Sequence, residues 1–294
     1  MKIGLVGTGL MGGPMALRLL TAGHQVWAYN RTPTKVKPLA LAGVNAVGKV
    51  DLLVESAEAL VLMLTDAAAI RAVLLQPEVQ PLLKGRTVLQ MGTISPADSR
   101  ALDQEFQALG ASYLEAPVLG SIPEAKSGKL IVMVGATAEQ YSQWLPLLKC
   151  FGPEPLHVGV VGTAAALKLA LNQLIGSLTT GFAQSLGLIQ KEGIAVAAFM
   201  QVLRNSALYA PTFDKKLDRM VGRKFADPNF PAKHLLKDMT LFVETAQQDG
   251  LEVAAAEQVQ QILQQTVEQG LGDTDYASLY NVVNPPQPPA DPSA

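Results

Sequence analysis

The feature that most constrains the fold is a regular alternation of short β-type runs and helical stretches up to about residue 158. The β-type runs are residues 2–6, 25–29, 59–64, 87–90, 112–115, 130–134 and 155–158. The helical stretches between them are residues 15–22, 51–56, 67–74, 96–109 and 138–148. Strands that alternate with helices in this way predict a doubly wound, mostly parallel sheet with helices on both faces.

The pattern changes at Gly162, after which the β-type runs stop. Residues 163–191 are compatible with one helix about 40 Å long, at ~1.5 Å per residue. This exceeds what one small domain needs, so we expect the helix to join two domains. The predicted division is a sheet domain over 1–161, a connecting helix over 162–192, an all-helical domain over 193–283 and a proline-rich, disordered tail over 284–294.

Composition narrows the kind of protein further. Lys and Arg total 23 against 25 Asp and Glu, so we expect neither a nucleic-acid partner nor an anionic membrane surface. The apolar N-terminus resembles a signal peptide, but its glycines and Pro14 would break a hydrophobic helix. No run of ~18 residues is free of polar groups and breakers, so no membrane span is expected. The single cysteine, Cys150, favours a reducing compartment, and we expect the cytoplasm.

A glycine-rich turn follows the first strand candidate and opens the first helix. It consists of Gly7, Thr8, Gly9, Leu10, Met11 and Gly12. The first glycine permits a tight turn, the second lets backbone amides approach a pyrophosphate, and the third lets helix and strand pack closely. The helix N-terminus then offers N–H groups and a positive dipole end to the phosphates. We therefore expect a dinucleotide site, with a glycine-rich turn that binds nothing as the alternative.

The end of the second strand candidate indicates which dinucleotide is bound. Sites for NAD normally place Asp or Glu there, to bind the ribose 2′-hydroxyl. This chain has Asn30, Arg31 and Thr32, followed by Lys35. An arginine and a hydroxyl would bind a 2′-phosphate that a carboxylate would repel, so we expect NADP(H). An ordinary polar loop is the alternative.

A solitary lysine marks the candidate catalytic group. Lys168 is the one Lys, Arg, Asp or Glu between Glu154 and Lys191, and its neighbours one helical turn away are small, apolar or Asn172. Burial of a lysine disfavours its charged form and suits it to proton transfer near neutral pH. A solvated or snorkelling lysine on a connecting helix is the alternative.

With these motifs the chain resembles the β-hydroxyacid dehydrogenase family, which includes 3-hydroxyisobutyrate dehydrogenases, tartronate semialdehyde reductases and glyoxylate/succinic semialdehyde reductases. The resemblance covers residues 1 to about 283 and is carried by residues 7–16, 115–128, 162–172 and 237–238. Residues 230–238 and 270–275 most resemble the glyoxylate/succinic semialdehyde reductase branch. The resemblance implies an NADP-binding Rossmann domain, an all-α C-terminal domain, and an NADP-dependent oxidoreductase acting on CH–OH groups. With the apolar connecting helix, it also implies a homodimer or homotetramer.

The resemblance assigns roles to individual residues. Lys168 matches the catalytic lysine, which would donate a proton to a carbonyl oxygen while NADPH delivers hydride to the carbon. With the glycine turn and the following loop included, the expected cofactor contacts are Gly7, Gly9, Leu10, Met11, Gly12, Asn30, Arg31, Thr32, Lys35, Leu64, Thr93 and Lys237. The expected contacts to a small carboxylic-acid substrate are Gly120, Ser121, Asn172, Phe230 and Asp238.

Some positions have a structural alternative or depart from the family. Ser95 is expected to be a helix N-cap, Phe230 could belong to the core, and Asp238 could be a surface residue. Leu119 stands where the substrate loop of the family usually has serine, which leaves the acid preference open, and Gln184 replaces a commonly acidic position. The three histidines and the cysteine show no metal-binding spacing, so no metal is expected.

The expected function is NADPH-dependent reduction of small aldehyde or 2-oxo acids such as glyoxylate or succinic semialdehyde. One alternative is oxidation of 3-hydroxyisobutyrate or a related β-hydroxy acid. Another is a dinucleotide-binding regulator without turnover, which should lack the lysine at position 168. Imine reduction is disfavoured for the same reason.

Overall fold

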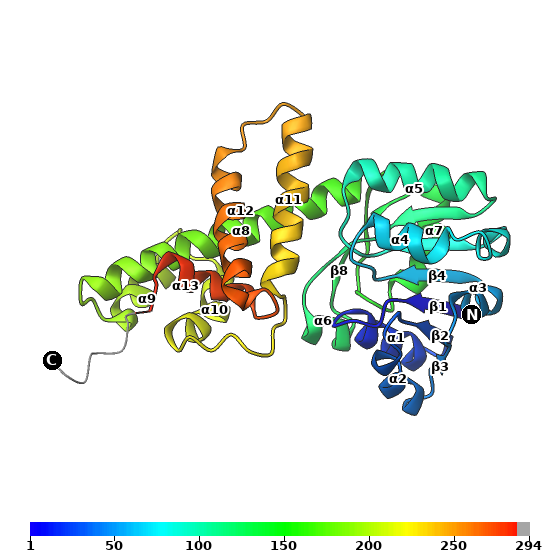
Figure 1. The fold of residues 1–294 in the computed structure, drawn as a ribbon, viewed down its shortest axis with the longest axis horizontal. Helices are drawn as coiled ribbons and strands as arrows, with labels where there is room; N and C mark the ends of the chain where they lie inside the picture. The colour runs from blue at the N-terminus through cyan, green and yellow to red at the C-terminus, as the bar shows by residue number, and fades with distance from the viewer. Residues whose placement is uncertain (287–294) are drawn as a thin grey trace. The chain divides into compact units, whose positions relative to one another are not determined.

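The computed structural model describes residues 1–286, which form two compact units. The first unit is Met1–Leu169 and the second begins at Ala170 (Figure 1). Asn284, where the tail is predicted to begin, is buried, and its N–H donates to the carbonyl of Tyr280 at 2.8 Å. Residues 287–294 of the predicted tail lie outside the described residues.

The first unit is built on a mixed but mostly parallel sheet with the strand order β3-β2-β1-β4-β5-β6-β8-β7, and β9 pairs with β8. The strands are β1 (Lys2–Val6), β2 (Gln25–Tyr29), β3 (Asn45–Ala46), β4 (Ala59–Leu62), β5 (Thr87–Gln90), β6 (Ser112–Glu115), β7 (Val118–Leu119), β8 (Ile131–Gly135) and β9 (Leu156–Gly159). Only the pairings of β8 with β6 and β7 are antiparallel. The carboxyl ends of β1, β4, β5 and β6 therefore lie at one edge of the sheet.

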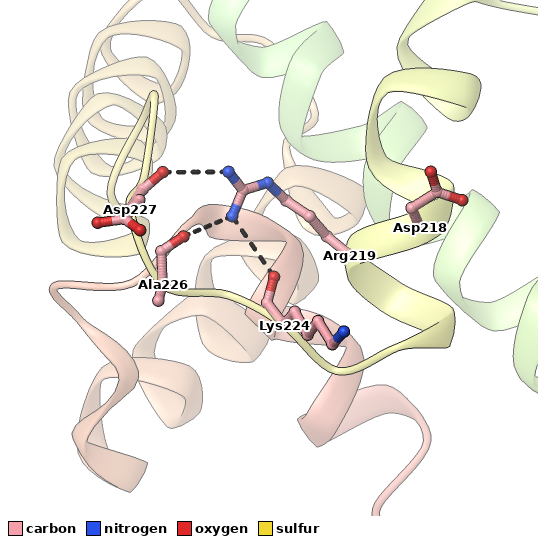
Figure 2. A pocket seen from close by; sticks show the side chains of 5 residues that line it. All are labelled: Asp218, Arg219, Lys224, Ala226 and Asp227. Atoms are coloured by element: carbon pink, nitrogen blue, oxygen red, sulfur yellow. Dashed lines mark hydrogen bonds between the residues drawn. The ribbon is translucent and has the colours of Figure 1, made fainter.

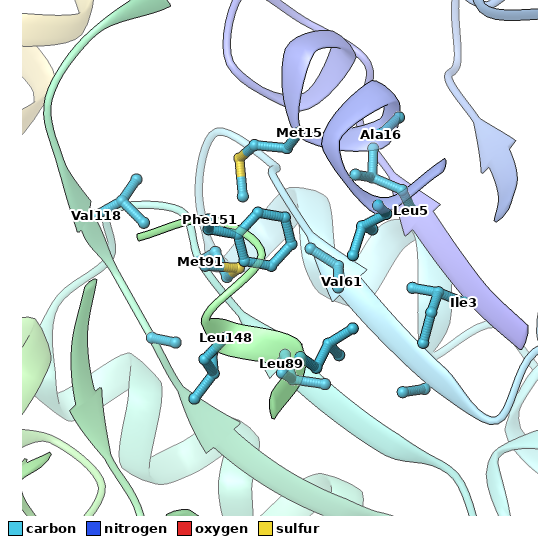
Figure 3. Packing of buried hydrophobic residues seen from close by; sticks show 14 of the residues in the cluster. Ile3, Leu5, Met15, Ala16, Val61, Leu89, Met91, Val118, Leu148 and Phe151 are labelled. Atoms are coloured by element: carbon cyan, nitrogen blue, oxygen red, sulfur yellow. The ribbon is translucent and has the colours of Figure 1, made fainter. Parts of the chain in front are cut away.

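Alternate residues of the central strands pack into two separate hydrophobic clusters, one on each face of the sheet. Ile3 and Leu5 of β1 join one cluster, whereas Val6 joins the other. The same alternation separates Val61 from Leu60 in β4. Figure 3 shows the first cluster, in which side chains of strands and helices pack together from distant parts of the chain. Both faces of the sheet are thus covered, as the apolar strands require.

The helices of the first unit cover these two faces. The described α-helices are α1 (Gly12–Thr21), α2 (Lys37–Leu41), α3 (Val50–Ser56), α4 (Ala67–Leu74), α5 (Pro96–Ala108), α6 (Ile122–Ser127) and α7 (Ala138–Leu148). Met15 of α1 and Trp144 of α7 belong to the first cluster. Ile70 of α4 and Phe106 of α5 belong to the second. The predicted doubly wound arrangement is confirmed.

The second unit is built from helices joined by loops, and its described part has one isolated β-bridge, between Pro231 and Asp275. Its α-helices are most of α8 (Thr163–Lys191), then α9 (Val196–Arg204), α10 (Pro211–Val221), α11 (Ala232–Gln248), α12 (Ala254–Thr266) and α13 (Tyr280–Val283). Phe182 and Leu186 of α8 pack into one core with residues of the later helices. The helix predicted over 163–191 is present with the same bounds.

The predicted elements differ from the structure mainly around short segments. The strand predicted over 59–64 ends at Leu62. The short elements β3, α2, β7 and α6 were not predicted, because two to six residues carry too little periodicity to be recognised.

Candidate functional site

The glycine turn after β1 has the shape and the donors that a pyrophosphate needs. Gly7 has a φ of +96°, and a Cβ there would lie 2.3 Å from the carbonyl oxygen of Met63. A Cβ on Gly12 would lie 1.9 Å from the carbonyl oxygen of Gly7, whereas one on Gly9 would meet nothing within 4 Å. Met11, which precedes α1, makes no side-chain capping hydrogen bond. Because the N–H of Gly13 donates to the carbonyl of Gly9 at 3.1 Å and Pro14 has no N–H, the N–H of Gly12 is the helix donor that a phosphate could use.

Hydrogen bonds join this turn to the loop after β2. The N–H of Thr8 donates to Oδ1 of Asn30 at 3.1 Å, and its hydroxyl donates to the carbonyl of Lys35 at 3.3 Å. Nδ2 of Asn30 donates to the carbonyl of Thr32 at 3.2 Å. The amide of Asn30 therefore holds the turn in place, while the side chains of Arg31, Thr32 and Lys35 are exposed at its rim.

The candidate catalytic lysine is buried. Lys168 is 8% exposed, and Ala164 and Ala165, one turn earlier in α8, are 0% and 4% exposed. Asn172, one turn later, is 1% exposed. The alternative of a solvated or snorkelling lysine is therefore wrong.

A buried carboxylate that was not predicted as functional lies at the start of the same helix. Glu115, the last residue of β6, is 1% exposed. Its Oε1 accepts the N–H groups of Gly162, Ala164 and Ala165 at 2.8, 2.7 and 3.1 Å. Its Oε2 accepts the hydroxyl of Ser99. Burial raises the pKa of Glu115, and these donors oppose that rise.

The predicted substrate loop contains a second unpredicted carboxylate contact. The N–H and the hydroxyl of Ser121 both donate to Oε2 of Glu124, each at 2.8 Å, at the start of α6. The neighbouring Gly120 has a φ of +134°. The donors expected to bind a substrate carboxylate are thus already bound to a carboxylate of the chain. The spacing Ser-x-x-Glu, with Pro123 near the helix start, could have revealed this capping box in the sequence.

In the second unit, three of the predicted residues are in contact, and two of them, Asn172 and Asp238, are buried. Nδ2 of Asn172 donates to Oδ2 of Asp238 at 2.6 Å, and Nζ of Lys237 lies 2.8 Å from Oδ1 of Asp238. Asp238 is 3% exposed, so its alternative as a surface residue is wrong. Oδ1 of Asn172 is buried and has no hydrogen-bond partner among the described residues. Because buried acceptors are normally hydrogen-bonded, this oxygen is suited to accept a hydrogen bond from a ligand.

The remaining predicted residues range from half-buried to exposed, and two of them have a structural role. Phe230 is half-buried and packs edge-to-face on Tyr276, with 5.7 Å between ring centroids, as its core alternative requires. Ser95 is the N-cap of α5, since its hydroxyl accepts the N–H of Asp98 at 3.0 Å, as predicted. Thr93 and Leu64 are half-buried in the loops after β5 and β4. Leu10, in the glycine turn, is 45% exposed.

A surface hollow in the second unit contains none of the predicted residues. It is lined by Asp218, Arg219, Lys224, Ala226 and Asp227 (Figure 2). The guanidinium of Arg219 donates to the carbonyls of Lys224, Ala226 and Asp227 at 3.4, 2.7 and 3.0 Å. The arginine therefore stabilises the loop after α10, and we assign no ligand to this hollow.

Metal-binding clusters and membrane-spanning helices are both absent from residues 1–286. This part of the chain contains no cluster of three or more His, Cys, Asp or Glu side chains suited to a metal ion. Within the same residues, every helix is too short or too polar to cross a membrane.

Two family models of known proteins match the chain, one over the sheet unit and one over the helical part. The family model described as the NAD-binding domain of 6-phosphogluconate dehydrogenase matches residues 2–162. The model described as the NAD-binding domain of NADP-dependent 3-hydroxyisobutyrate dehydrogenase matches residues 162–283. Together they span the glycine turn, Lys168, and the Asn172–Asp238 pair.

Individual relatives cover nearly the whole chain. Glyoxylate/succinic semialdehyde reductase 1 of Arabidopsis thaliana is 26% identical over 96% of this chain and 98% of its own length. The 2-hydroxy-3-oxopropionate reductase of Escherichia coli is 28% identical over 95% and 96%. The crystal structure of a 3-hydroxyisobutyrate dehydrogenase from Salmonella typhimurium shares the fold, with a TM-score of 0.86, 24% identity and coverage of 96% and 99%.

A Rossmann unit with an open glycine turn, followed by a helical unit, defines an NAD(P)-dependent oxidoreductase acting on the CH–OH group of hydroxyacids. Since the two family models together match almost all of its described residues, the chain belongs to the β-hydroxyacid dehydrogenase family.

Proposed function

We propose that this protein is an NADPH-dependent reductase of small aldehyde or 2-oxo acids such as glyoxylate or succinic semialdehyde. The observation that carries the proposal is the burial of Lys168, which is 8% exposed, in a helix segment without another charged side chain. Buried titratable side chains are typical of catalytic sites, and a reductase needs a proton donor at the carbonyl oxygen. The relatives named as reductases of these substrates support the substrate class.

The cofactor would be held by the first unit. The open backbone at Gly9 and the N–H of Gly12 at the start of α1 would receive the pyrophosphate. Arg31, Thr32 and Lys35 would bind the 2′-phosphate, and their exposure leaves them accessible to it. We expect Met11, Leu64 and Thr93 of the same unit, and Lys237 of the second unit, to complete the contacts. When bound, the nicotinamide supplies the hydride that reduces the carbonyl carbon.

The residues of the chain would supply the proton and the orientation. In the proposed reaction, Lys168 donates a proton to the carbonyl oxygen, and its charge stabilises the oxyanion as it develops. Asn172 is oriented by its hydrogen bond to Asp238, and its free Oδ1 would accept a hydrogen bond from the substrate. Ser121 and Gly120 would bind the substrate carboxylate in exchange for the contact of Ser121 with Glu124, and Phe230 would line the apolar side.

A panel of steady-state rates tests this proposal. We expect purified protein to oxidise NADPH with glyoxylate or succinic semialdehyde, with a higher kcat/KM for NADPH than for NADH. A faster NAD-linked oxidation of 3-hydroxyisobutyrate would instead support the function named for the Drosophila melanogaster relative. Binding of NADPH without turnover of any of these substrates would support a regulatory protein.

We further propose a cytoplasmic homodimer or homotetramer. Along α8, Leu174, Leu178 and Leu188 are 50%, 40% and 62% exposed, and such a row of leucines is typical of a surface covered by another subunit. Light scattering of the purified protein would show a dimer or tetramer mass, and a monomer mass would contradict this assignment.

A further inference from the structure

The carboxylate of Glu115 packs against a glycine of the neighbouring strand, at a place where a larger residue would not fit. A Cβ on Gly135, in the neighbouring strand β8, would lie 2.4 Å from Oε1 of Glu115. Gly162, whose N–H donates to the same oxygen, has a φ of +101°, a conformation that favours glycine. A Cβ on Gly135 would therefore displace the carboxylate, whereas Gly162 contributes its N–H to the same oxygen.

The way α8 is capped differs from the way other helices of the first unit are capped. The starts of α5 and α7 are capped by Ser95 and Thr137, which immediately precede them. The start of α8 is capped by Glu115, whose partners are 47 to 50 residues away along the chain. A local cap satisfies N–H groups, whereas a cap from the sheet also fixes where the helix begins.

The strands place this cap at the edge of the sheet where the cofactor turn lies. Glu115 ends β6, and β6 is connected to β1 through the parallel pairings of β5 and β4. Gly7 directly follows β1, so both groups lie at the carboxyl edge of the sheet. Lys168 follows Ala164 and Ala165, two of the amides that Glu115 accepts, by one helical turn.

We propose that Glu115 is a positioning residue, which ties the first turn of α8 to the end of β6 and thereby fixes Lys168 relative to the cofactor turn. This inference rests on the proposed role of Lys168 as the proton donor. A shift of about 1 Å in a catalytic group can cost ~10²-fold in rate, so loss of the tie should act mainly on kcat.

The first readout is steady-state kinetics of three variants. Glu115→Ala should lower kcat about 30- to 100-fold, and the dissociation constant of NADPH should change less than about twofold. Glu115→Gln keeps an amide oxygen that can accept the same N–H groups, so it should recover kcat to within about tenfold of wild type. Thr137→Ala removes the local cap of α7 and is the matched control; it should lower Tm with kcat within about twofold of wild type.

The second readout does not require a known substrate. In Glu115→Ala the backbone amide of Lys168 should exchange with solvent at least about tenfold faster, with Leu186 in the same helix as the internal reference. Unchanged protection at Lys168, or an equal loss of kcat in Thr137→Ala, would overturn the positioning role. If wild type reduces none of the proposed substrates, the proposed function fails, and the exchange measurement still decides on Glu115.

Discussion

The two units stabilise buried carboxylates in different ways. In the first unit, Glu115 is bound by backbone N–H groups and the hydroxyl of Ser99. In the second unit, Asp275 and Asp238 are ion-paired with Lys216 and Lys237, each at 2.8 Å. Backbone donors fix the position of an element, whereas a lysine adds a cation on a flexible stem. We therefore expect that removing a partner of a buried carboxylate displaces a helix in the first unit, and leaves a buried charge without its counter-ion in the second.

The largest effect is expected for the buried cation of the first unit. Lys168→Ala should lower kcat by ~10²–10⁴-fold, the usual contribution of a positioned acid or base, with NADPH affinity nearly unchanged. Stopped-flow rates and equilibrium titration with NADPH would measure both quantities. A variant with near-normal turnover would show that the proton comes from another group.

The next effect concerns stability in the second unit. Lys216 is 8% exposed, it contacts both carboxylate oxygens of Asp275, and its ammonium lies 4.1 Å from the ring centroid of Tyr276. Lys216→Met leaves Asp275 buried without this partner and should cost about 3–5 kcal/mol of unfolding free energy. Urea unfolding would measure the loss.

The exposed ion pair of Arg204 and Asp214 provides a matched control for this substitution. Because the pair is in contact with solvent, Arg204→Met should have a much smaller effect on the urea midpoint. Equal losses in the two variants would show that burial does not determine the strength of the Lys216–Asp275 pair.

A smaller effect is expected where a carboxylate of the chain competes with the substrate. Glu124→Gln should keep the capping box of α6, because the box of α7 uses Gln140 at the same position. Loss of the charge should lower KM for glyoxylate about five- to tenfold, and should leave KM for the uncharged glycolaldehyde less affected. The exposed Glu139→Gln is the charge-matched control. An equal change for both substrates would mean that Ser121 does not bind the carboxylate.

The smallest effect concerns pH and stability. Burial and the nearby Lys233 lower the pKa of His234, so the folded state favours the neutral ring. As pH falls through about 6.5, the unfolded chain takes up the proton first, and the contribution of His234 to stability is progressively lost. Tm should therefore fall less between pH 7.5 and 5.5, both ~1 unit from that value, in His234→Gln than in wild type. Parallel curves would contradict this sign.

Much of the fold could be predicted from the sequence, because strand and helix periods are local. Residues close together in the sequence determine the alternation in the first unit, the single helix over 163–191 and the N-cap at Ser95. The glycine turn could be predicted for the same reason. Its conformation depends on Gly7 and Gly12 and on the strand and helix that flank them.

The contacts of the candidate site were harder to predict, because they join distant residues. Glu115 meets α8 across about fifty residues, and Asn172 meets Asp238 across 66. No local period encodes such pairs; they form only when the sheet and the helices are assembled. Glu124 is different, since its contact with Ser121 spans three residues and has a recognisable signature.

In the proposed reaction, hydride from NADPH reaches a carbonyl carbon while the protein supplies the proton. The most direct test is to incubate the protein with glyoxylate and NADPH dideuterated at C4 of the nicotinamide, and to analyse the product by mass spectrometry. We expect glycolate with a single carbon-bound deuterium, formed at least ~10²-fold more slowly by Lys168→Ala. Consumption of NADPH without deuterated glycolate, or deuterium transfer at an undiminished rate in the variant, would contradict it.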